Sequence, residues 1–87
     1  MEVFLHESAE KFLKDLEKEI RSKITTDLKK LSLDPYSKQL DIKKLKGLKG
    51  KQDLFRLRVG EYRVIYFIDE NKIWITEILK REHGYNF

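Results

Sequence analysis

Apolar residues in the first third of the chain recur in steps of three and four, which is the spacing of one helix face. A strand is expected at residues 3–6, with Ser8 as the N-cap of the following helix. The stripe is long for a single helix in a small domain, so we expect a helical hairpin with its break at residues 17–20. Asp34-Pro35 should end the second helix, because proline disfavours the helical conformation at the residue before it. The stripe consists of Phe12, Leu13, Leu16, Ile20, Ile24, Leu28 and Leu31.

The last third of the chain alternates between apolar and polar residues and predicts a three-stranded antiparallel meander. Gly60-Glu61 suits a two-residue type II′ hairpin turn, which prefers glycine at its first central position. Residues 34–53, between the helices and the meander, are predicted to be a basic connector. The strands are expected at 54–59, 62–68 and 73–80.

The turn at Gly60-Glu61 fixes the register of the first hairpin and therefore the residues that share each face. Arg58 is then opposite Arg63, with Arg56 two residues earlier on the same side. The other side should meet the helices and carries Phe55, Leu57, Val64 and Tyr66. We assign Tyr66, Phe67 and Trp74 to packing of the sheet. Ile65 and Phe67 also make part of the sheet surface apolar, and we expect a partner protein to cover it.

Length and composition limit the chain to one small domain. Its 87 residues are 40% hydrophobic and 39% charged, and we take residues 1–87 as a single α+β domain. The absence of cysteine excludes disulfides, zinc knuckles and thiol nucleophiles. Two histidines far apart in the sequence give no metal-ligand spacing, so neither a metal nor a cofactor is expected. The chain has no membrane-length apolar run and no signal peptide, which predicts a cytoplasmic protein without membrane attachment.

Positive charge is concentrated in the middle of the sequence. Residues 38–63 hold nine Lys and Arg against three Asp and Glu, a net charge of +6, whereas the whole chain carries +4. Such asymmetry indicates an anionic partner, of which nucleic acid is the commonest, although a solvated lysine-rich surface is the alternative. The lysines that we predict to bind this nucleic acid are Lys43, Lys44, Lys46, Lys49, Lys51 and Lys80.

The predicted pairing of Arg58 with Arg63 is unfavourable unless an anion lies across the two side chains. Like charges directly opposite each other destabilise a sheet. A phosphate would reverse that effect, because arginine offers it two parallel donors. The alternative is neutralisation by nearby acids, for which Asp53, Glu61 and Glu77 are the candidates.

The segment DLFRLRVGEYRVIYF (53–67), a third strand and the ending KREHGYNF (80–87) resemble the RelE/ParE superfamily of type II toxins. The resemblance covers essentially the full length, and its specific part is the R-x-R-x-G-x-Y-R-x-x-Y run at 56–66. It implies a curved sheet with the helices on one face, and an mRNA endonuclease, often dependent on the ribosome, that is neutralised by a cognate antitoxin.

The resemblance also implies which residues form the active site. Arg63 corresponds to the family's arginine on the middle strand, and Arg56 and Arg58 stand where the RelE branch usually has lysines. Arg81 corresponds to its late basic residue and Tyr85 to its C-terminal tyrosine. Another branch has a catalytic histidine near the position of His83. The predicted catalytic set is Arg56, Arg58, Arg63, Arg81, His83 and Tyr85.

Arginine stays protonated and accepts protons poorly, so replacing the family's lysines leaves the general base open. His83 is the favoured candidate because an imidazole titrates near neutral pH. The other candidates are Lys80, Glu82 and Tyr85, whereas His6 is assigned a structural role.

The expected partners are mRNA, the ribosome and a RelB-like antitoxin that covers apolar sheet or helix surface, in a heterotetrameric toxin–antitoxin complex. Two alternatives stay open. The chain could be a ParE-like inhibitor of DNA gyrase without nuclease activity, or an inactive toxin that only binds its antitoxin.

Overall fold

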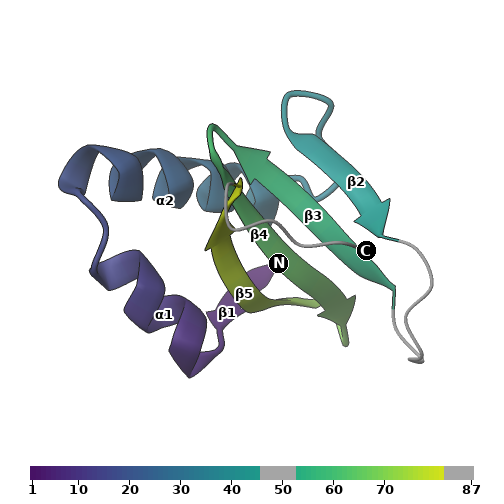
Figure 1. Cartoon of the computed structure of the whole chain (residues 1–87). Helices are drawn as coiled ribbons and strands as arrows, with labels where there is room; N and C mark the ends of the chain where they lie inside the picture. The colour runs from purple at the N-terminus through teal and green to yellow at the C-terminus, as the bar shows by residue number, and fades with distance from the viewer. Residues whose placement is uncertain (46–52, 82–87) are drawn as a thin grey trace.

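The computed structural model describes residues 1–45 and 53–81, which form two helices and a five-stranded mixed sheet (Figure 1). Both helices lie together on one side of the strands (Figure 1). The strand order is β1-β5-β4-β3-β2, with β1 parallel to β5 and all other neighbours antiparallel. The predicted α+β fold is therefore confirmed. The elements are β1 (Glu2–Leu5), α1 (Glu7–Lys14), α2 (Lys18–Leu33), β2 (Asp41–Leu45), β3 (Leu54–Val59), β4 (Tyr62–Asp69) and β5 (Lys72–Lys80).

The helical hairpin is confirmed, but its cap and its break differ from the prediction. His6, not Ser8, is the N-cap of α1, because its Nδ1 accepts a hydrogen bond from the Ser8 N–H at 3.2 Å. The break lies at residues 15–17, earlier than the predicted 17–20. Arg21 explains this position, since its Nη1 donates to the carbonyl oxygen of Lys14 at 3.1 Å and so satisfies the end of α1.

The connector at residues 34–53 contains an edge strand that the sequence analysis missed. The second helix ends at Leu33, before Asp34-Pro35, as predicted. Strand β2 then follows at Asp41–Leu45 and, among the described strands, pairs with β3 alone. Its sequence, DIKKL, has no apolar alternation to indicate a strand, because three of its five residues are charged.

The register of the first hairpin is the predicted one, with Arg58 opposite Arg63 and Val59 opposite Tyr62. Gly60 has φ +60°, which the predicted type II′ turn requires. Between β4 and β5 the register shifts at Ile65/Tyr66. Thr76 lies at this bulge and donates its hydroxyl to the Ile65 carbonyl at 3.2 Å. The bulge keeps Ile75 and Ile78 on the same face, although they are three residues apart.

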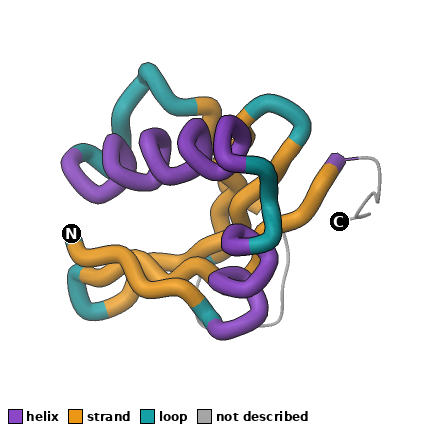
Figure 2. Tube along the Cα trace, turned by 90° about the vertical axis from the view of Figure 1, so that its left-hand side faces the viewer, coloured by secondary structure: helices purple, strands orange, loops and turns teal. Residues whose placement is uncertain are grey.

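The core lies between the helices and one face of the sheet, which we call the inner face. Figure 2 shows α2 running along this side, separated from the strand layer. Each fully buried aliphatic side chain of this core stabilises the fold by about 1.5–3 kcal/mol relative to leaving it exposed. The most deeply buried side chains of the core are Ala9, Ile24, Leu31, Leu57, Val64, Tyr66, Ile73 and Ile75.

Candidate functional site

The three predicted arginines lie on the sheet face that points away from the helices, which we call the outer face. Leu57 and Val64 are fully buried on the inner face, and side chains alternate along a strand. Arg56 and Arg58 on β3 and Arg63 on β4 therefore share the outer face, with Arg58 directly opposite Arg63. All three side chains therefore lie on one side of the sheet, as the hairpin register predicts.

Arg56 is held by a carboxylate that the sequence analysis did not single out. Its Nη2 is 2.8 Å from Oδ1 of Asp41, and its side chain is 15% exposed while that of Asp41 is 56% exposed. Asp41 is also directly opposite Arg58 in the β2–β3 pairing. The acid therefore lies between two arginines and offsets part of their repulsion. Recognition of β2 as a strand would have revealed Asp41, because alternation then places it on the outer face.

The other two arginines differ from Arg56 in their surroundings. Arg58 is exposed, and its Nε donates to the Gly60 carbonyl at 3.5 Å, the outer limit of a hydrogen bond. Arg63 is half-buried. The Nε of Arg56 is buried and reaches no acceptor among the described residues.

Arg81 lies beside the turn that joins the two arginine-bearing strands. Its backbone N–H donates to the carbonyl of Glu61 at 2.6 Å, and its side chain is exposed. Lys80, directly before it, is opposite Tyr62, whose ring packs against Phe12 of α1. Lys80 therefore belongs to the inner face and is not brought to the arginines.

The predicted lysines divide between the two faces. Lys43 is opposite Arg56 and lies on the outer face. Lys44 is opposite Phe55 on the inner face, and its Nζ is 3.3 Å from Oδ2 of Asp53. The structure therefore does not bring Lys44 to the arginines. The remaining predicted residues lie outside the described part of the chain: Lys46, Lys49, Lys51, His83 and Tyr85.

A row of aromatic rings from β1, β5 and β4 crosses the outer face. Trp74 on β5 stacks against Phe4 on β1 with ring centroids 4.9 Å apart, and Phe67 on β4 lies 6.3 Å away on the other side. Lys72 Nζ is 5.9 Å from the centre of the Phe4 ring. These contacts agree with the packing role given to Phe67 and Trp74, and Tyr66 is buried in the core. Phe4 was not predicted to take part.

The outer face thus carries guanidinium groups, which can bind a phosphodiester, and, farther along β4, aromatic rings that stack on one another. Among the described residues, no three His, Cys, Asp or Glu side chains gather where they could hold a metal ion. Within residues 1–45 and 53–81, neither helix is long and apolar enough to cross a membrane.

Comparison with known families gives a match over almost the whole sequence. Residues 3–85 match the family model described as the ParE toxin of the type II toxin–antitoxin system parDE. The chain is also 35% identical over 86 residues to the Methanocaldococcus jannaschii protein RelE1, covering 95% of this chain and 92% of that protein.

Solved structures share the fold. The archaeal RelE–RelB complex from Pyrococcus horikoshii OT3 superposes with a TM-score of 0.79 at 30% identity, covering 95% of this chain and 97% of that one. A RelB–RelE antitoxin–toxin complex from Methanococcus jannaschii gives a TM-score of 0.74 at 26% identity, covering 92% of each chain.

Proposed function

Since the chain belongs to the RelE/ParE family of toxins of type II toxin–antitoxin systems, we propose that it is a metal-independent endoribonuclease that cleaves mRNA on the ribosome. A cognate RelB-like antitoxin would neutralise it. This partner is supported by the relatives from Pyrococcus horikoshii and Methanococcus jannaschii, whose structures are RelB–RelE complexes. A heterotetramer of two toxins and two antitoxins is the assembly that we expect.

The proposed reaction is an internal transfer at one phosphodiester of the RNA. A base takes the proton of the 2′-hydroxyl, and the 2′-oxygen attacks phosphorus. The bond from phosphorus to the 5′-oxygen then breaks, and an acid gives that oxygen a proton. The products are a 2′,3′-cyclic phosphate and a 5′-hydroxyl. Extra negative charge develops on the phosphoryl oxygens in the transition state, and positioned cations stabilise it there.

The observation that carries this proposal is the placement of Arg56, Arg58 and Arg63 on one sheet face, with Arg81 beside the adjoining turn. The hairpin fixes the first three relative to one another, so little reorganisation is needed when the phosphate binds. Arg63 is the half-buried member of the opposed pair. We assign it the largest share of transition-state stabilisation, because an electrostatic interaction strengthens as water is excluded.

The general base must be a residue other than the arginines, because arginine accepts protons poorly. His83 remains our assignment, and we assign Tyr85 to stacking on a base of the RNA. An exposed carboxylate, Glu77, also projects from β5 on the outer face, opposite Ile65. Cleavage assays of His83→Gln and Glu77→Gln distinguish the two, since only the change that removes the general base should abolish most of the activity.

The test is cleavage of mRNA in a translation mixture by the purified, antitoxin-free protein. Removing one donor of this kind typically costs about 10²–10³-fold in rate, so Arg63→Ala should lose that much. Arg63→Lys should recover only part, because lysine cannot make the bidentate contact. Lys18→Ala is the matched control, since it removes a positive charge from the exposed start of α2. Mapped ends should carry a 5′-hydroxyl, and unchanged cleavage by Arg63→Ala would contradict the assignment.

The second candidate is inhibition of DNA gyrase without RNA cleavage. It is supported by the family model, which is described as a ParE toxin, and by the presence of arginines where RelE proteins usually carry lysines. Supercoiling assays run beside the translation assay separate the two. Inhibited supercoiling together with intact transcripts would favour the gyrase alternative.

A further inference from the structure

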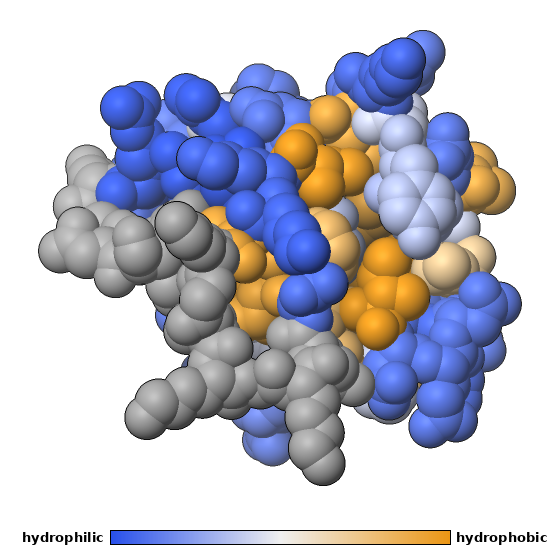
Figure 3. All heavy atoms as spheres, turned by 90° about the vertical axis from the view of Figure 1, so that its right-hand side faces the viewer, coloured by the Kyte–Doolittle hydropathy of each residue, from blue (hydrophilic) through white to orange (hydrophobic). Residues whose placement is uncertain are grey.

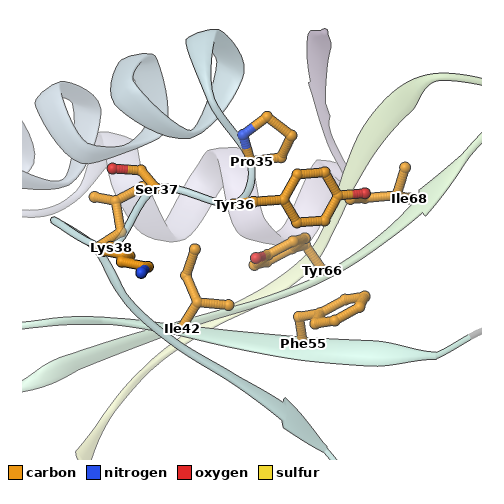
Figure 4. Close-up of a pocket in the computed structure, with 9 residues that line it drawn as sticks. Pro35, Tyr36, Ser37, Lys38, Ile42, Phe55, Tyr66 and Ile68 are labelled. Atoms are coloured by element: carbon orange, nitrogen blue, oxygen red, sulfur yellow. The ribbon is translucent and has the colours of Figure 1, made fainter.

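Asp41 is an acid on the face of the sheet that carries the arginines. It is the first residue of β2, which lies at one end of the described sheet. Figure 3 views the molecule from the side of β2 and shows hydrophilic side chains around an apolar area. Figure 4 shows the next residue, Ile42, pointing into a pocket that Tyr36 and Tyr66 line on the inner side. Side chains alternate along a strand, so Asp41 projects from the outer face.

The carboxylate of Asp41 binds an arginine that is not its direct neighbour in the sheet. Asp41 is directly opposite Arg58, and Lys43 is directly opposite Arg56. The ion pair nevertheless runs diagonally, with Oδ1 of Asp41 2.8 Å from Nη2 of Arg56, the length of a charge-assisted hydrogen bond. The acid thus occupies the guanidinium whose side chain is mostly covered, while Arg58 stays exposed.

A carboxylate and a phosphodiester compete for the donors of a guanidinium. Both are anions whose oxygens accept the parallel N–H bonds that arginine offers. In the structure, the Nη2 of Arg56 already donates to the carboxylate of Asp41. A phosphate that takes the same N–H therefore has to displace Asp41.

The surroundings favour such an exchange. Asp41 is exposed and begins an edge strand, so its side chain can turn into water, and an ion pair of this exposure contributes little. A phosphate between the strands is also attracted by Arg58 and Arg63, which lie directly opposite each other. Asp41 has one ion-pair partner among the described residues, whereas the phosphate has several cations within reach.

We propose that Asp41 is an internal mimic of the substrate phosphate, which occupies Arg56 in the free protein and yields it when single-stranded RNA binds. Binding of unrelated RNA rests on phosphate contacts alone, so a carboxylate that must first be displaced weakens it. A substrate that further contacts hold in place still displaces Asp41. The inference rests on the proposed RNA substrate, but not on which residue is the general base.

The binding test uses the purified full chain and a short fluorescein-labelled RNA whose 2′-hydroxyls are methylated, so that the proposed reaction cannot cleave it. Fluorescence anisotropy gives the Kd at several salt concentrations. Asp41→Asn should lower the Kd about threefold, because Arg56 is then unoccupied. The slope of log Kd against log salt should steepen by about 0.7, the value for one further phosphate contact to a single strand.

Two control variants separate the exchange from a general change of charge. Asp69→Asn removes the same charge at the far end of β4, where Asp69 is opposite Lys72. Salt screens a charge at that distance, so the Kd should not change. Asp41→Glu keeps a carboxylate beside the arginines and should bind RNA more weakly than Asp41→Asn does. Circular dichroism verifies that each variant is folded.

The exchange can be observed directly in the Nε–H signal of Arg56, in a ¹⁵N spectrum of the arginine side chains. Adding the methylated RNA to the parent protein should move this signal. Asp41→Asn should move it without RNA, because both changes remove the carboxylate from the guanidinium. The signal of Arg21 is the internal control and should stay in place, since its Nη1 donates to the Lys14 carbonyl between the helices.

Several outcomes would overturn the proposed exchange. They are an unchanged or raised Kd with Asp41→Asn, an equal gain in affinity with Asp69→Asn, and an Arg56 signal that RNA does not move. In the cleavage assay Asp41→Asn should lower the KM, and a loss confined to kcat would show instead that Asp41 orients Arg56 for the reaction.

The nuclease activity and the exchange are tested separately. If the binding results hold but the chain cleaves no RNA, only the proposed nuclease activity is contradicted. If the chain cleaves RNA but the binding results fail, only the role of Asp41 is contradicted.

Discussion

The two faces of the sheet are built from the same strands, but the outer face carries three arginines among its apolar residues. On the inner face, Leu57, Val64 and Tyr66 are almost completely buried against the helices. On the outer face, the residues between them include Arg56, Arg58 and Arg63, and Arg58 lies directly opposite Arg63, which is an unfavourable pairing of like charges. The contrast shows that the inner face specifies the fold, and that the outer face keeps charges which the fold alone does not need.

The first test of this difference between the faces removes the same group of atoms from each of them. Leu57 is fully buried, whereas Leu79 is half-buried and lies opposite Arg63 on the outer face. Leu57→Ala should lower the free energy of unfolding by about 2–5 kcal/mol, because it leaves a cavity in the core. Leu79→Ala should cost about 1 kcal/mol or less. Urea denaturation followed by circular dichroism measures both, and equal losses would show that the faces do not differ in this way.

A second test uses alkaline pH to probe the inner face. Burial, and to a smaller degree the charge of Tyr36, raises the pKa of the Tyr66 phenol to about 12. The folded state therefore favours the protonated phenol. The resulting stability is fully present below pH 10, where the unfolded phenol titrates, and is lost as the pH rises through 12. Between pH 10 and 12 the free energy of unfolding should fall by about 2 kcal/mol relative to Tyr66→Phe, which lacks the group. Parallel curves for the two proteins would contradict the raised pKa.

A third test compares two arginines of the outer face, for which we expect smaller changes in the free energy of unfolding. Arg58→Gln removes one of two directly opposed charges and should raise the free energy of unfolding by a few tenths of a kcal/mol. Arg56→Gln removes the partner of Asp41 and should lower it by about 0.5 kcal/mol, since that ion pair is partly exposed. Both variants should cleave RNA more slowly. A loss of stability with Arg58→Gln would mean that its charge is neutralised within the fold.

Much of the fold could be predicted from the sequence, because the helices and the hairpin have strong hydrophobic periodicities. The helical stripe, the stop before Asp34-Pro35 and the turn at Gly60 each have a local physical cause, and each is present in the structure. The break between the helices was placed too late, since it depends on Arg21 reaching back to the carbonyl of Lys14, which no periodicity encodes. Strand β2 was missed because pairing with β3, rather than its own DIKKL sequence, makes it a strand.

The candidate site was predictable only where it follows from the hairpin register. The turn placed Arg58 opposite Arg63, so the shared face of the three arginines could be deduced before the structure. The contact between Asp41 and Arg56 could not, because it joins the hairpin to the strand that was missed. The face on which Lys44 lies could not be predicted for the same reason, since it is set by the β2–β3 register.

The parallel pairing of β1 with β5 also sets an order of events during synthesis. In the described sheet, Val3 and its neighbours have a single strand beside them, and that strand begins at Lys72. A nascent chain must therefore hold its first strand unpaired until the residues from Lys72 onward have left the ribosome. Contacts this distant in sequence form late and slowly. The sheet is therefore completed only after the helices and the first hairpin have been synthesised.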